Sequence, residues 1–309
     1  MREEDVATDS GGVRLAGTLT RPEGTGPYPV ALFLHGTGPL DRNENSPGQR
    51  LDIFRDLARA LAGAGYASLR WDKRGCGASG GDYLRHGLDD LVVDAAAWLE
   101  YCAAQDGLAP PVLIGHSEGT LIAPLVARTR RDVAAMVLIC PFAGKTIPLL
   151  RAQAREMAEA LGRMRGLKGW ILRAAAWATG GPERRQEREI VRLMSSTAPV
   201  LRIGLRRVPA RSLRDLMQAD PMAVHAAHRI PTLALAAGAD IQCDPGDAAR
   251  IAGANPAVTA QVLPGVSHLL RRVEGRGGFE TYPAQIGREI APEVAGAVIS
   301  WLDWQTGRA

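Results

Sequence analysis

Short hydrophobic stretches recur along the chain and alternate with longer segments of helical spacing. The stretches contain many β-branched and aromatic residues and lie at residues 13–20, 30–34, 66–71, 112–114, 133–140, 232–237 and 258–263. Helical patterns occur between most of them, at residues 50–62, 88–104, 118–129 and 247–252. Strands that alternate with helices predict βαβ units, in which a mainly parallel sheet is covered by helices on both faces.

The two ends of this pattern differ from its middle. The stretch at residues 13–20 reaches the next strand through a short link, so we expect it to begin an antiparallel edge. Near the other end, Val294, Val298 and Trp301 recur at helical spacing. A last helix is therefore expected to close one face of the sheet.

The alternation stops between residues 141 and 229. A helical stripe covers residues 150–164, and further helical patterns follow at residues 170–178 and 183–195. This segment is too long for a simple crossover between two strands. We therefore predict a core formed by residues 1–140 and 230–309, and a helical lid formed by residues 141–229, whose Met and Trp side chains mainly pack among its own helices.

The composition is that of a globular protein. Of the 309 residues, 46% are hydrophobic and 23% are charged, which excludes a disordered or collagen-like chain. No apolar run approaches the roughly 18 residues of a membrane span, and the start MREEDV is acidic where a signal peptide is basic. The sequence predicts a cytoplasmic protein, and it does not indicate an oligomeric state.

Charge is distributed unevenly along the chain. The net charge is +4, yet residues 145–229 hold 17 basic and 7 acidic side chains, which leaves a net charge of −6 elsewhere. A basic lid would favour anionic substrates if its arginines faced the site. Nucleic-acid binding is not expected, because the basic segment lacks the interleaved aromatic residues of a single-strand platform.

The four cysteines give no sign of a metal site. Cys76, Cys102, Cys140 and Cys243 form no CxxC pair and are too sparse for a disulfide scaffold. We expect four free thiols, no metal ion and no cofactor.

Two segments match the pattern G-x-S-x-G, at residues 77–81 and 115–119. A nucleophile elbow needs a strand that leads directly into the serine and a helix that leaves it. Ser117 has both, whereas Ser79 lies in a glycine-rich loop well past its strand. Ser117 is therefore the predicted nucleophile, with Gly115 and Gly119 at positions where strand and helix approach closely.

A serine nucleophile needs a histidine base that follows it in this fold. His268 lies in a loop directly after the stretch that ends at residue 263, and it is the predicted base. His225 and His228 are interpreted as a solvated helix end.

The orienting acid is expected between the serine and the histidine. Asp240 follows the stretch at residues 232–237 through a glycine, at the carboxyl edge of the sheet. Asp244 and Asp247 are rivals, although Asp244 precedes a proline as in a turn and Asp247 resembles a helix N-cap.

An oxyanion hole requires two backbone N–H donors. Glu118, the residue after the nucleophile, is expected to provide one, and Thr37 in the turn after residues 30–34 the other. The Glu118 side chain starts beside the nucleophile, so its carboxylate is expected either to have a charge partner or to reach bulk solvent. If it has a partner, Arg42 is the first choice. Five residues are expected to line the site: His35, Gly36, Gly38, Arg42 and His116.

Five segments carry a family resemblance: HGTGPLDRNEN, LRWDKRGCGASGG, IGHSEGTLIAPLVA, GADIQCDP and GVSHLLR. In this order they resemble the α/β-hydrolase superfamily, and most its bacterial carboxylesterases of the serine-aminopeptidase and dienelactone-hydrolase type. The resemblance covers the chain except the lid. It implies a triad of Ser117, Asp240 and His268 with oxyanion donors at Thr37 and Glu118, in agreement with the residues themselves.

The same resemblance implies that the DKRGCGAS loop is structural. Asp72, Arg74 and Ser79 should then support the site without taking part in the chemistry.

The function predicted from the sequence is hydrolysis of a small-molecule carboxylic ester through an acyl-enzyme on Ser117. An acyl-CoA thioesterase or a serine aminopeptidase could use the same triad. A catalytically silent binding protein of the same fold is the alternative outside enzymes.

Overall fold

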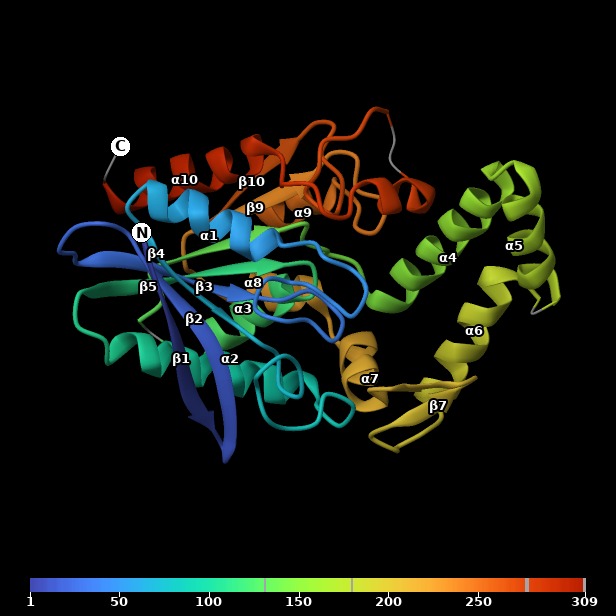
Figure 1. The fold of residues 1–309 in the computed structure, drawn as a ribbon, viewed down its shortest axis with the longest axis horizontal. Coiled ribbons are helices and arrows are strands. Elements are labelled where there is room, and N and C mark those ends of the chain that lie inside the picture. The colour runs from blue at the N-terminus through green and yellow to red at the C-terminus, as the bar shows by residue number, and fades with distance from the viewer. Residues whose placement is uncertain (131, 179, 276–277, 308–309) are drawn as a thin grey trace.

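The computed structural model describes residues 1–130, 132–178, 180–275 and 278–307. Within these ranges, eight strands form one sheet in the order β1-β2-β4-β3-β5-β6-β9-β10 (Figure 1). The strands are β1 Arg2–Ser10, β2 Val13–Arg21, β3 Tyr28–Leu34, β4 Ala67–Trp71, β5 Leu108–His116, β6 Ala135–Ile139, β9 Thr232–Ala237 and β10 Val258–Leu263. All seven hydrophobic stretches of the sequence correspond to strands.

The pairing is parallel from β4 to β10 and antiparallel at the other edge. The antiparallel pairing of β2 is confirmed, but β2 is not the edge, because β1 pairs along its whole length. A two-residue turn at Gly11-Gly12, both with positive φ, joins the two strands, as tight hairpins require. Hydrophobicity did not indicate β1 because its residues REED are exposed, and charged residues protect an edge strand from further pairing.

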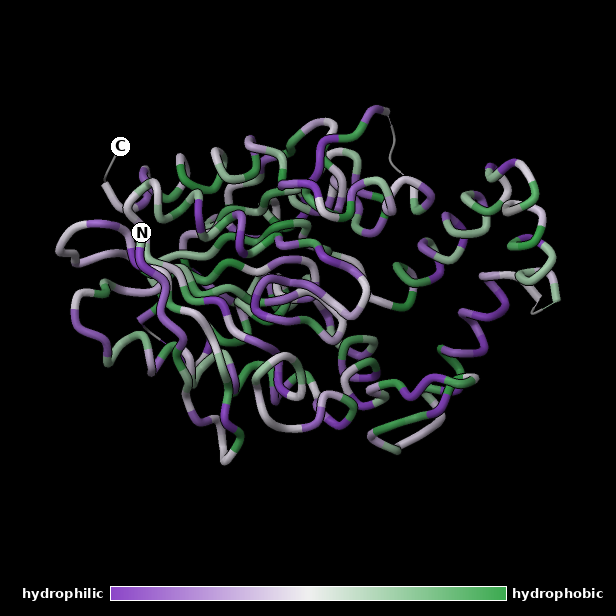
Figure 2. Tube along the Cα trace, viewed as in Figure 1, coloured by the Kyte–Doolittle hydropathy of each residue, from purple (hydrophilic) through white to green (hydrophobic). Residues whose placement is uncertain are grey.

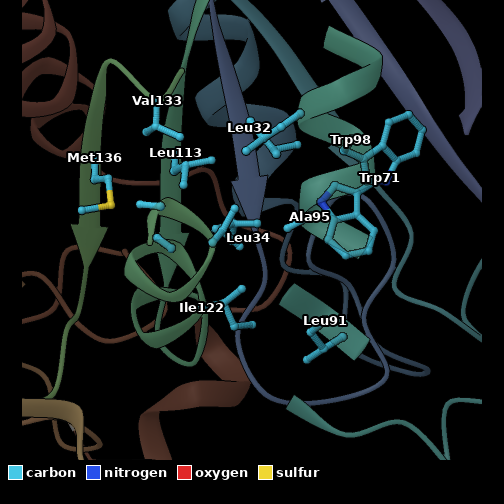
Figure 3. Packing of buried hydrophobic residues seen from close by; sticks show 14 of the residues in the cluster. Leu32, Leu34, Trp71, Leu91, Ala95, Trp98, Leu113, Ile122, Val133 and Met136 are labelled. Carbon is cyan, nitrogen blue, oxygen red and sulfur yellow. The ribbon is translucent and has the colours of Figure 1, made fainter. Parts of the chain in front are cut away.

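Alternating side chains of the central strands build two hydrophobic layers. Leu32 and Leu34 of β3 face one layer, while Ala31 and Phe33 face the other. The first layer is covered by α2 (Leu88–Ala103) and α3 (Gly119–Ala127), and Figure 3 shows Trp98 of α2 beside Trp71 within it. The second layer is covered by α1 (Ile53–Gly63) and by the last helix, α10 (Pro292–Thr306).

Two shorter helices complete the core. Helix α9 (Asp247–Ala254) connects β9 to β10 and packs against both strands, and a 3-10 helix, η1 (Phe279–Ala284), precedes α10. The result is a mainly parallel sheet with helices on both faces, which is the α/β-hydrolase fold.

The segment between β6 and β9 is helical and projects from one end of the sheet (Figure 1). Its helices are α4 Thr146–Arg163, α5 Gly166–Ala178, α6 Gly181–Met194, α7 Ala210–Gln218 and α8 Pro221–Ala226, with a small hairpin of β7 Leu201–Ile203 and β8 Arg206–Val208. The helical patterns of the sequence correspond to α4, α5 and α6, whereas α7, α8 and the hairpin were not predicted. Figure 2 shows that α6 is largely hydrophilic, in contrast to the green central strands. We call residues 141–229 the insertion.

None of the described helices is both long enough and apolar enough to cross a bilayer.

The connection from β5 to α3 passes very close to the end of β3. A Cβ added at Gly119 would lie 2.0 Å from the carbonyl oxygen of Leu34, and one at Gly115 would lie 2.3 Å from the carbonyl oxygen of Gly119. These neighbours are backbone atoms and cannot move aside as a side chain end can. The contact between β3, β5 and α3 therefore requires glycine at both positions.

Replacing Gly119 by alanine tests this constraint. Gly119→Ala should lower the free energy of unfolding by at least about 3 kcal/mol, because the strand and helix must separate. Gly296→Ala is the matched control, since Gly296 is helical, exposed and has no atom near an added Cβ. It should raise the stability by up to about 1 kcal/mol. Urea denaturation of both variants measures the difference, and equal stabilities would contradict the packing described.

Candidate active site

A cavity of about 520 Å³ opens at the carboxyl end of the sheet, between the core and the insertion. Ser117, His268 and the loop after β3 lie at its core side. The insertion contributes its other wall through residues before and on α4 and on α7: Phe142, Thr146, Leu149, Leu150, Gln153, Leu213, Leu216 and Met217. Most of these side chains are apolar, so the cavity suits a ligand with a hydrophobic portion.

Ser117 occupies the sharp turn between β5 and α3. Its φ of 51° lies in the left-handed region, which is strained for a residue with a Cβ. The turn is held because the Ser117 N–H donates to Ile139 O at 3.0 Å and the Ser117 carbonyl accepts from both the N–H and the hydroxyl of Thr120. The strain keeps the serine side chain at the cavity surface, as in a nucleophile elbow.

His268 and Asp240 form the hydrogen-bonded pair expected from the sequence. His268 Nδ1 lies 2.7 Å from Asp240 Oδ2, and both side chains are nearly fully buried. Because a carboxylate only accepts, Nδ1 carries the hydrogen and Nε2 can accept a proton. Backbone N–H groups of Gln242 and Cys243 also donate to Asp240 Oδ1. Burial alone would raise the pKa of Asp240, but His268 and these donors leave it below its usual value.

The two rival acids have other partners. Asp244 accepts from the Gly246 N–H and pairs with Arg250, in the turn predicted for it. Asp247 is the first residue of α9, not its N-cap, and its Oδ2 accepts from the Ala143 N–H. Neither carboxylate bonds to His268.

Ser79 also lies outside the candidate site. Its hydroxyl donates to the carbonyl of Asp72 and accepts from the N–H of Ala16. Asp72 in turn accepts from the Arg42 side chain and from the Ala78 N–H. These bonds attach the loop after β4 to β2, which agrees with the structural role that the resemblance implies.

His225 and His228 differ from their predicted environment. The sequence indicated a solvated helix end, yet both side chains are buried. Their backbone carbonyls accept from the Asn255 side-chain amide, which fixes the end of α8 against α9. The prediction failed because the two histidines of HAAH end a helix that packs against α3 and α9.

The Glu118 side chain pairs with Lys73, not with Arg42. Lys73 Nζ lies 3.0 Å from Glu118 Oε2, and the two side chains are 2% and 3% exposed. Arg42 instead contacts Asp72 and Asp5 and does not line the cavity. A partner for Glu118 was expected correctly, but its identity was wrong because Lys73 belongs to the loop that was interpreted as purely structural.

A second buried pair joins Glu44 to His116. His116 Nδ1 lies 2.9 Å from Glu44 Oε1, and its Nε2 lies 3.0 Å from the carbonyl oxygen of His268. Both partners are acceptors, so each ring nitrogen must donate and His116 carries a positive charge. Burial would lower the pKa of His116, yet the attraction of Glu44 raises it overall. Burial would likewise raise the pKa of Glu44, and the His116 charge and the Gly36 N–H lower it overall.

The loop after β3 presents backbone to the cavity. Gly36, Thr37 and Gly38 line it, whereas His35 is buried below, where burial first and the Lys73 charge second lower its pKa to about 4. Among the described residues, the N–H groups of Thr37 and Glu118 donate to no other protein group. Both are therefore free to bind an oxygen in the cavity.

The positive charge of the insertion does not reach the cavity. No arginine or lysine is among the described residues that line it, and several insertion arginines pair with acids elsewhere, such as Arg151 with Glu187 and Arg211 with Asp90. The condition for electrostatic selection of anionic substrates by the insertion is therefore not met at the cavity wall.

Two groups of side chains that include His268 are of the chemical types that bind metal ions. They are His116 with Cys140 and His268, and Asp240 with Cys243 and His268. The histidines and Asp240 are already bonded to protein groups, and burial raises the pKa of both thiols well above its usual value. Protonated thiols and occupied histidines are poor metal ligands.

Together, the fold and this arrangement define a hydrolase-type site on an α/β-hydrolase core. A family model described as "Serine aminopeptidase, S33" matches residues 48–272, and the chain belongs to this family of α/β hydrolases.

The chain is also similar to two named proteins, EstD and Est1E. The esterase EstD of Thermotoga maritima is 22% identical over 298 residues, which are 95% of this chain and 66% of EstD, so the chain spans slightly less than two thirds of that relative. Est1E of Butyrivibrio proteoclasticus, solved with ferulic acid bound, superimposes with a TM-score of 0.66 at 18% identity over 98% of this chain and 99% of that one.

A third similar structure is the esterase Pf2001 of Pyrococcus furiosus. Its TM-score is 0.60 at 15% identity, over 98% of this chain and 90% of that one. At such identities these structures show that the fold is shared.

The Glu44–His116 pair predicts a pH dependence of stability. The raised pKa of His116 gives stability that is complete below the ordinary pKa of His and is lost as the pH rises through the folded value. The lowered pKa of Glu44 gives stability that is complete above the ordinary pKa of Glu and is lost as the pH falls. Asp240 also attracts His116, and His35 and the Gly36 N–H face Glu44.

The double variant Glu44→Gln, His116→Gln removes both titrating groups. The wild-type chain should lose stability relative to this variant as the pH rises above the ordinary titration range of histidine, because the raised pKa of His116 places its deprotonation there. Urea denaturation at neutral and at alkaline pH measures the difference. A difference that stays constant would contradict a charged His116.

Proposed function

We infer that the chain is a serine carboxylesterase that hydrolyses neutral esters with an apolar acyl or alcohol group. The observation that carries this proposal is the Asp240–His268 hydrogen bond beside Ser117, which stands on a strained turn in an apolar cavity. The similarity to EstD supports ester hydrolysis, and the family match supports a serine hydrolase.

In the proposed reaction, His268 Nε2 accepts the Ser117 proton while the serine oxygen attacks the ester carbonyl carbon. Asp240 stabilises the imidazolium that forms and keeps the ring in the required tautomer. The N–H groups of Thr37 and Glu118 stabilise the oxyanion. His268 then protonates the leaving alcohol, and a water molecule, activated by the same histidine, releases the acid from the acyl-enzyme.

The cavity favours a neutral substrate. Among the described residues that line it, the carboxylates are those of Glu44 and Glu118, and each is paired with a buried cation, although Glu44 Oε2 accepts no hydrogen bond from the protein. A serine aminopeptidase must bind the positive α-amino group of its substrate, and both carboxylates are already charge-paired. An acyl-CoA substrate gains no basic contact from the lining either, so the ester remains the function that the cavity supports best.

The insertion serves as the lid in this proposal. Leu149, Leu150, Leu213 and Met217 come from α4 and α7 and face the cavity that contains Ser117. Helix α4 is also tied to the core, because Gln153 donates to the carbonyl of Gln242 at 3.0 Å. The lid then selects by shape and hydrophobicity, since its arginines lie elsewhere.

Removing the nucleophile tests the proposal directly. Ser117→Ala should reduce kcat for a p-nitrophenyl ester on the order of 10⁴ to 10⁶-fold, because only the oxyanion hole and binding remain. Ser79→Ala, from the other G-x-S-x-G segment, is the matched control and should retain ester turnover. A Ser117→Ala chain with wild-type turnover would show that Ser117 is not the nucleophile.

A further inference from the structure

Gly36 lies in the loop that presents Thr37 to the cavity, and both of its backbone polar groups bind buried charged side chains. Its N–H donates to Glu44 Oε1 at 2.8 Å, and its carbonyl oxygen accepts from Lys73 Nζ at 2.7 Å. There is little space around it, because an added Cβ would lie 3.1 Å from Glu44 Oε1 and 3.3 Å from Ser117 Cβ. The peptide on each side of Gly36 is therefore fixed in orientation.

The two charged groups that hold Gly36 are in turn held by the neighbours of the nucleophile. Glu44 pairs with His116, which precedes Ser117, and Lys73 pairs with Glu118, which follows it. All four side chains are buried. Two ion pairs thus connect the nucleophile turn to the loop after β3, one on each side of Ser117.

The planarity of the peptide bond gives this arrangement a chemical consequence. In a trans peptide the C=O of Gly36 and the N–H of Thr37 point in opposite directions. Lys73 holds the Gly36 carbonyl away from the cavity, so the Thr37 N–H must point the other way. Without that bond, the carbonyl could rotate toward the cavity, and an acceptor would then replace a donor beside a developing negative charge.

Stability alone does not account for two such pairs. Burying an ion pair costs desolvation free energy, and apolar replacements of buried pairs are often neutral or stabilising. Orientation of one peptide group is a task that an apolar side chain cannot perform, because it has no donor for the Gly36 carbonyl.

We propose that Lys73, Glu118, Glu44 and His116 form a clamp on Gly36 that aims the Thr37 N–H at the oxyanion. These four are positioning residues, and the Lys73–Gly36 hydrogen bond is the contact that sets the donor direction. The proposal rests on the proposed function, because it assigns the clamp to the oxyanion hole of the same site.

The test compares two variants that differ only in Lys73. Glu118→Gln removes the negative charge but keeps a lysine, which donates to the Gly36 carbonyl in either protonation state. The double variant Lys73→Met, Glu118→Gln removes the donor as well and leaves no unpaired charge. Glutamine for Glu118 and methionine for Lys73 are neutral replacements of similar volume. Thermal unfolding of each variant checks that it is folded before activity is compared.

Relative to Glu118→Gln, the double variant should show a kcat lower by about 10 to 100-fold with KM changed less than about 3-fold, because the oxyanion forms in acylation and in deacylation. A trifluoromethyl ketone, which forms a tetrahedral oxyanion adduct, should bind more weakly by a similar factor. If Lys73 acted only as a structural ion-pair partner, the two variants would match in kcat and differ in thermal stability alone. That outcome would overturn the clamp.

The rate of fluorophosphonate labelling separates this proposal from the proposed function. A wild-type chain that is labelled on Ser117, with the two variants labelled at equal rates, overturns the clamp and leaves the esterase proposal intact. A wild-type chain that is neither labelled nor active on esters overturns both. Slower labelling of the double variant than of Glu118→Gln supports both.

Discussion

The candidate site depends on one close backbone contact, where the start of α3 meets the end of β3. Gly119 lies so near the Leu34 carbonyl that no side chain fits between them. This contact brings Ser117 and Gly36, which are far apart in the sequence, to the same corner of the sheet. Ser117 accepts a left-handed φ as part of the same turn, because the strand before it and the helix after it are both fixed by packing. The geometry of the site is thus set by the core.

The charges at this site are paired within the protein. Glu44 and Glu118 line the cavity but are neutralised by His116 and Lys73, and the wall contributed by the insertion is mostly apolar. A low-polarity cavity strengthens the electrostatic effect of the few groups that remain available to a bound substrate. The excess of arginines in the insertion would have suggested a positively charged cavity wall. The structure shows instead that the net charge of a segment does not determine the charge of the surface that faces a ligand.

The sequence predicted the fold well where periodicity reports burial. Central strands and covering helices were found because hydrophobic side chains recur at spacings of strand or helix, while β1 was missed because an exposed, charged edge has no such signal. The pairing of His268 with Asp240 was predictable because each follows a strand that ends at the same sheet edge. Lys73 was missed because its partner, Glu118, lies 45 positions away and nothing local to either residue encodes the contact. The available signal was that Lys73 follows β4 and Glu118 follows β5, two strands that end at the same edge of the sheet.

Intact-protein mass spectrometry during turnover of an activated ester tests most directly for the proposed acyl-enzyme at Ser117. Rapid acid quenching should trap a species heavier than the free chain by the mass of the acyl group, and peptide mapping should place that group on Ser117. Hydroxylamine should remove it, as expected for an ester linkage to serine. An acyl group mapped to a residue other than Ser117 would contradict this mechanism. Turnover of a slowly deacylating ester with no acylated species would contradict it as well.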